Sequence, residues 1–105
     1  MIQFPWFSLK KHDEFANNLA IEFIQHCPPD LVYKPKNRKA NNKLNKAINN
    51  LYTLAHAYRN NVKLNIYTKA RIGNKFMWSL KEAGYDDALI EELTNGILLA
   101  LSGKE

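Results

Sequence analysis

The sequence is poor in the residues that mark disulfide-rich, fibrous or disordered proteins. Cys27 is the only cysteine among 105 residues, and the chain has only 4 glycines and 4 prolines. A single cysteine excludes an internal disulfide and a cysteine-based zinc site, and so little glycine and proline argues against a low-complexity chain. The length suits one small domain, and the lone cysteine is typical of a reducing, cytoplasmic compartment.

Long apolar runs are also absent. The longest unbroken run, Ile97 to Leu101, is far shorter than the helix that a lipid bilayer requires. No basic segment followed by an apolar one opens the chain, so we expect no secretory signal. We therefore predict a protein without a membrane partner.

Carboxylates are missing from the middle of the chain. No Asp or Glu occurs between Asp30 and Glu82, whereas twelve lysines and arginines do. Opposite charges normally alternate on solvated helices because such pairs stabilise them modestly. A segment of one sign repels itself and requires a compensating anion. The anion is either an external partner or the acidic C-terminal segment folding back.

Apolar residues recur at helical spacing in four segments separated by helix-ending residues. The first runs over about residues 9–27, and Pro28 and Pro29 end it. The second follows a basic loop and runs from Ala40 to Val62. The third covers residues 66–84, with Ile66, Ala70, Gly73, Met77 and Leu80 on its apolar face, and the fourth covers residues 87–101.

These segments predict an all-α fold, a small up-and-down bundle of about four helices in a single domain, residues 1–105. Residues 1–8 form an aromatic N-terminal extension, because Phe4, Trp6 and Phe7 show no helical period. The last helix is apolar over much of its circumference. Such a helix is either central in the bundle or forms a homodimer interface.

The sequence contains few groups of residues that could catalyse a reaction together, and we predict that the protein is not an enzyme. His12, His26 and His56 lie on different segments, and none has a second metal ligand at helical spacing. No glycine-rich phosphate loop is present. We therefore expect no metal and no cofactor.

A basic surface on the second and third helices predicts binding of a polyanion, foremost RNA or another single-stranded nucleic acid, through its backbone. On the second helix, Lys39, Lys43 and Lys46 follow one another along a row. Aromatic rings alternate with cations on the third, where Trp78 points away from the predicted core face. The predicted site residues are Lys36, Arg38, Lys39, Lys43, Lys46, Lys69, Arg71, Lys75 and Trp78.

Two alternatives fit the same residues. The lysines also suit an adaptor, inhibitor or accessory subunit that docks on an acidic protein, with aromatic residues as anchors. Trp78 is either an exposed stacking ring or a ring packed against Trp6. Sequence-specific DNA reading by a helix-turn-helix is disfavoured, because its second helix would carry four carboxylates towards the phosphates: Asp86, Asp87, Glu91 and Glu92.

Overall fold

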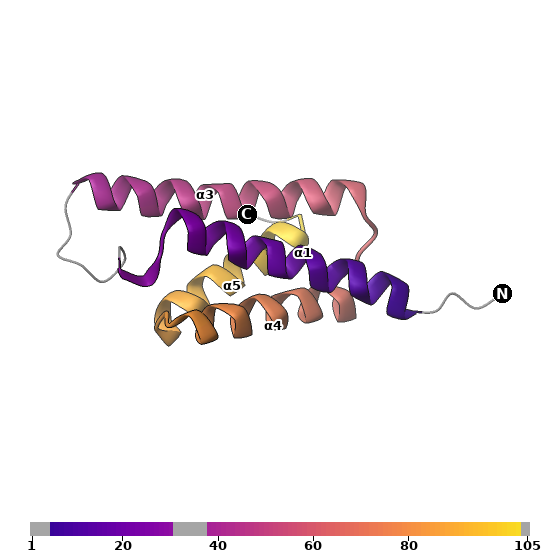
Figure 1. The fold of residues 1–105 in the computed structure, drawn as a ribbon. Helices are drawn as coiled ribbons and strands as arrows, with labels where there is room; N and C mark the ends of the chain where they lie inside the picture. The colour runs from indigo at the N-terminus through magenta and orange to yellow at the C-terminus, as the bar shows by residue number, and fades with distance from the viewer. Residues whose placement is uncertain (1–4, 31–37, 104–105) are drawn as a thin grey trace.

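The computed structural model describes residues 5–30 and 38–103, with side chains described from Lys10 to Asp30 and from Asn42 to Gly103. Four helices carry the fold: α1 (Pro5–His26), α3 (Arg38–Asn61), α4 (Ile66–Ala83) and α5 (Asp87–Leu101). No strand occurs within the described ranges. The predicted all-α, up-and-down bundle is confirmed, because successive helices reverse direction along the chain (Figure 1).

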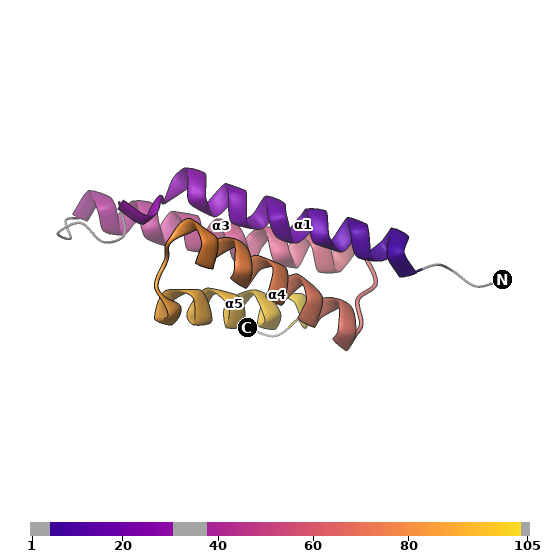
Figure 2. The ribbon, with the colours of Figure 1, turned by 60° about the horizontal axis from the view of Figure 1, so that its bottom comes forward.

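Each helix packs against two others. α1 contacts α3 and α4, and on the far side of the core α5 contacts the same two helices. Consequently α3 and α4 occupy opposite corners of the bundle, and the short link over residues 62–65 crosses it diagonally (Figures 1 and 2). α1 and α4 run parallel to each other, and so do α3 and α5.

The first helix begins earlier than the sequence predicts. α1 starts at Pro5, so residues 5–8 of the predicted aromatic extension are helical, and Ser8 lies inside the helix instead of capping it. Proline suits the first helical position because its fixed φ matches the helix and its missing N–H has no partner there in any case. Phe4 lies outside the described residues, as do the side chains of Trp6 and Phe7.

Gly84 and Asp86 form the turn between α4 and α5. Gly84 ends α4 with a left-handed φ of 104°, which a residue with a side chain rarely adopts. The Asp86 side chain then accepts a hydrogen bond from the Leu89 amide and caps α5. At the other end of α4, Asn65 and Thr68 form a reciprocal capping box.

The core lies between all four helices and includes Phe23, Leu51, Phe76 and Ile97. The apolar width of α5 is used within the bundle, because this helix packs against both α3 and α4. Glycines allow the close approaches. A Cβ at Gly96 would overlap the phenol of Tyr52 on α3, and one at Gly73 would press on Leu98.

The buried face of α4 agrees with the predicted one at Gly73 and Leu80 but is rotated away from Ile66 and Ala70. Its buried residues are Thr68, Ile72, Gly73, Phe76 and Leu80, whereas Ile66 is 82% exposed and Ala70 is also exposed. The buried face is rotated because α4 packs against both α1 and α5. The side of the helix that faces the space between these two neighbours is the side that is buried. In the described part of the chain, no helix has both the length and the apolar character that crossing a membrane requires.

Candidate functional site

Three of the predicted site residues cannot be placed. Lys36 lies outside the described residues, while Arg38 and Lys39 belong to the first turn of α3 with side chains outside the described set. The other six divide into two groups. Lys43 and Lys46 lie on α3, and the remaining four lie on α4.

Two of the four residues on α4 are engaged within the protein. Arg71 donates two hydrogen bonds to Asp13 of α1, from Nε at 2.8 Å and from Nη2 at 2.9 Å. The pair holds the pKa of the Asp13 carboxyl below its usual value, chiefly through these hydrogen bonds. Lys69 donates to Ser102 at the end of α5. Arg71 is therefore a clamp between α1 and α4, and its charge is largely neutralised.

The other two, Lys75 and Trp78, are exposed on the outer side of α4. There they border a shallow depression of about 320 Å³, and we call its lining the α4 surface: Tyr67, Ala70, Arg71, Asn74, Lys75 and Trp78. Lys75 forms no ion pair with a described residue, and its charge helps to lower the pKa of Asp13. Its ammonium group is therefore available to an external anion.

Two aromatic rings stand at the ends of the α4 surface. Trp78 is 56% exposed and Tyr67 is 61% exposed. Lys81 lies with its Nζ 5.3 Å from the centre of the Trp78 ring, a cation–π contact that orders the indole. Of the two alternatives for Trp78, the exposed ring agrees with this geometry.

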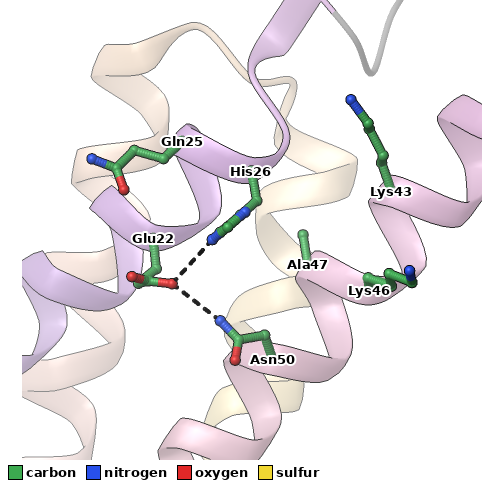
Figure 3. Close-up of a pocket in the computed structure, with 7 residues that line it drawn as sticks. All are labelled: Glu22, Gln25, His26, Lys43, Lys46, Ala47 and Asn50. Atoms are coloured by element: carbon green, nitrogen blue, oxygen red, sulfur yellow. Dashed lines mark hydrogen bonds and ion pairs between the residues drawn. The ribbon is translucent and has the colours of Figure 1, made fainter.

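Lys43 and Lys46 line a different hollow, a groove of about 510 Å³ between α1 and α3 (Figure 3). Both side chains are exposed, and neither makes an ion pair with a described residue. Gln25 and His26 lie across the groove on α1. Glu22 also lines it, but its Oε1 accepts a hydrogen bond from Asn50 at 3.2 Å and lies 3.4 Å from His26 Nε2.

The bundle topology separates the two groups of cations. A common surface for all these cations was predicted, yet α3 and α4 occupy opposite corners with α1 between them. At the acidic start of α5, Asp87 forms an ion pair with Lys81 at 4.0 Å. Lys43 and Lys46 on one side of α1, and Arg71 and Lys75 on the other, thus form two areas that flank α1. Lys69 lies apart from both, in a hollow with Arg59 and Lys63 at the end of α5.

Polar groups buried between α1 and α3 serve the fold. His12 is 3% exposed, and its Nδ1 lies 2.7 Å from the Tyr58 hydroxyl. Burial lowers the pKa of His12 and raises that of Tyr58 to about 12, so both groups are neutral near pH 7. No set of three or more His, Cys, Asp or Glu side chains within residues 5–30 and 38–103 is arranged to hold a metal ion.

Comparison with protein-family models, with curated proteins and with solved structures finds no match to this chain. The chemistry of the α4 surface is therefore inferred from its own side chains.

Sequence reasoning missed Tyr67 and Asn74 as members of the site. A usable signal is present, because Tyr67, Asn74 and Trp78 are separated by seven and four residues and so share one helix face. Helix spacing could not predict that Arg71 joins α4 to α1. Its partner, Asp13, lies 58 positions away along the chain.

Proposed function

We propose that the protein is a non-enzymatic binding protein that holds single-stranded nucleic acid, foremost RNA, along the α4 surface. The observation that carries the proposal is the pair of exposed rings, Tyr67 and Trp78, with the unpaired cation Lys75 between them. Proteins that bind single strands combine these two elements. Aromatic rings stack on bases, and cations follow the phosphates.

The spacing of the rings suits a short stretch of strand. Eleven residues separate Tyr67 from Trp78, which corresponds to about 16 Å along the helix. A stacked strand advances about 3.4 Å per nucleotide, so roughly five nucleotides would span this distance. Asn74 lies between the rings and offers both a hydrogen-bond donor and an acceptor to base edges.

The electrostatics of the α4 surface itself agree with a phosphate partner, and the exposed carboxylate of α4, Glu82, lies one turn beyond Trp78. No carboxylate occurs between Ile66 and Lys81, so the α4 surface has no acidic side chain of its own. Asp13, the carboxylate that reaches it from α1, is bound by Arg71. Lys75 contributes one phosphate contact, and Lys81 contributes a second once a phosphate displaces its 4.0 Å ion pair with Asp87. For a single strand, two contacts predict a salt dependence of about −1.4 in log–log slope.

Fluorescence anisotropy of a labelled uridine oligonucleotide tests the proposal. We expect salt-sensitive binding to the single strand and weaker binding to a duplex, whose paired bases cannot stack on the rings. Trp78→Ala should weaken binding about 5- to 150-fold, the range for loss of one stacked base. Ile66→Ala is the matched control, because Ile66 is an exposed apolar residue of the same helix that lies outside the α4 surface.

No binding at low salt would overturn the proposal. Equal loss of affinity in Trp78→Ala and Ile66→Ala would also contradict it. The exposed rings suit a second partner, an acidic protein for which Tyr67 and Trp78 would be the anchors. Purification of one acidic protein with the chain after nuclease treatment, together with no affinity for oligonucleotides, would favour that function.

Two finer expectations remain part of the proposal. Cytoplasmic location is supported by the Cys27 thiol, which is free and buried, and whose pKa burial raises. A homodimer through α5 has less support. Most of the apolar width of that helix is covered by α3 and α4, although Leu99 remains 49% exposed.

A further inference from the structure

We infer that a bound strand continues from Trp78 over the end of α1 into the groove that holds Lys43 and Lys46, so that the full site accepts roughly ten nucleotides. This inference rests on the proposed function and extends it to a second, separate phosphate-binding area. It assigns a role to the α1–α3 groove (Figure 3).

The contacts between helices place the two areas at the same end of the bundle. Trp78 lies near the end of α4, and just beyond it the Tyr85 hydroxyl donates to the carbonyl of Cys27, directly after α1. The same end of α1 meets the middle of α3, where Asn50 donates to Glu22, and the lysines lie one to two turns earlier on α3. Because α1 packs against both α4 and α3 (Figure 1), a strand that leaves Trp78 meets the last turns of α1 before it reaches the lysines.

The last turns of α1 present little negative charge along this path. Between Glu14 and Asp30 the only carboxylate is Glu22. Asn50 and His26 already occupy one of its oxygens. Ile21, which is 42% exposed, and Gln25 lie one turn apart and offer a strand an apolar contact and an amide. The first half of α1 is less favourable, because Glu14 is exposed there.

The length of the path follows from helix geometry. Crossing from α4 over α1 to α3 covers two interhelical distances, about 16–20 Å in total. Together with about 16 Å along α4, the path approaches 35 Å, which a stacked strand covers with roughly ten nucleotides. Single-strand sites of individual small folds lie in the range of about 4–16 nucleotides.

Oligonucleotide length separates this inference from the proposed function. A uridine pentamer should occupy only the α4 surface, whereas a dodecamer should also reach Lys43 and Lys46. For wild type, the log–log salt slope should steepen from about −1.4 for the pentamer to about −2.8 for the dodecamer, since two further phosphates are neutralised. The double variant Lys43→Gln/Lys46→Gln should return the dodecamer slope to about −1.4 and weaken its binding by about tenfold at 50 mM salt.

The matched control is Arg59→Gln/Lys63→Gln, which removes the same charge from the last turn of α3 and from the link that follows it, at the opposite end of the bundle from Lys43 and Lys46. We expect it to leave the dodecamer slope nearly unchanged. If the lysine variant and this control behave alike, or if the pentamer and the dodecamer bind wild type with equal slopes, the inference is overturned while the α4 surface stands. If neither oligonucleotide binds wild type, the proposed function itself fails.

Discussion

The hydrogen bond between Tyr58 and His12 joins α1 to α3 inside the bundle, and its removal has a calculable cost. His12 is 3% exposed, and its Nδ1 lies 2.7 Å from the Tyr58 hydroxyl. Phe15 stacks on the Tyr58 ring with 3.7 Å between ring centres. Tyr58→Phe keeps this stacking and deletes only the hydroxyl. The buried ring nitrogen of His12 then loses its partner.

An unsatisfied buried polar group costs about 1–3 kcal/mol. With a urea m-value of about 1–3 kcal/mol per molar, the unfolding midpoint should fall by roughly 1 M. Urea unfolding followed by circular dichroism at pH 7.5 measures this shift. Tyr52→Phe is the control, because the Tyr52 hydroxyl has no hydrogen bond to a described residue. Its unfolding free energy should change by less than about 0.5 kcal/mol.

Two results would refute this reasoning. The first is an unchanged midpoint in Tyr58→Phe. The second is an equal loss of stability in the two phenylalanine variants, since removal of a hydroxyl alone would then explain the effect.

Three further predictions concern the fold and assembly. Burial lowers the pKa of His12 in the folded protein. The unfolded chain therefore binds a proton at His12 at a higher pH than the folded protein does. The unfolding free energy should therefore fall as pH drops below about 6.5, by at most about 1.4 kcal/mol per pH unit, and less so in His12→Asn. Gly96→Ala should cost about 1–2 kcal/mol in urea unfolding because its Cβ would overlap Tyr52, whereas Gly73→Ala, with its nearest contact at 3.2 Å, should cost far less. If α5 forms a homodimer interface, light scattering shows a dimer that Leu99→Lys dissociates, whereas a monomer mass at high concentration contradicts a dimer through α5.

The local features of the fold were predictable because they depend on neighbouring residues. Asp87–Leu101 is a helix with the predicted bounds. Its start is set by the carboxylate cap at Asp86, and Gly84 ends the preceding helix by adopting a positive φ. The start of α1 was missed for an equally local reason, because the large residues around Pro5 show no period although proline suits the first helical turn.

The orientation of α4 was not predictable from its own pattern. Apolar residues occur on more than one side of this helix, and counting them favours Ile66, Ala70 and Met77. The choice of Ile72 and Phe76 as core residues depends on where α1 and α5 lie. The positions of α1 and α5 depend in turn on the link after α3. A link of this length can lead to a neighbouring or to the opposite corner of a bundle, and here it leads to the opposite one.

The candidate site was predictable only in its chemistry. The sequence indicates the cations and leaves Trp78 either exposed or packed against Trp6. It does not show that Asp13 binds Arg71 or that Ser102 accepts a hydrogen bond from Lys69. Such pairs form between residues far apart in the chain, and they decide which charges remain available. The charge of Lys75, on the outer side of α4, remains available.

Emission from Trp78 during titration with a single strand tests the central claim most directly. In a Trp6→Phe chain, Trp78 is the only tryptophan, so its fluorescence reports on the α4 surface alone. We predict saturable quenching by a uridine oligonucleotide at low salt, because the exposed indole stacks on a base, and loss of this quenching at high salt. Emission that stays constant while the oligonucleotide binds would show that the strand lies elsewhere on the protein.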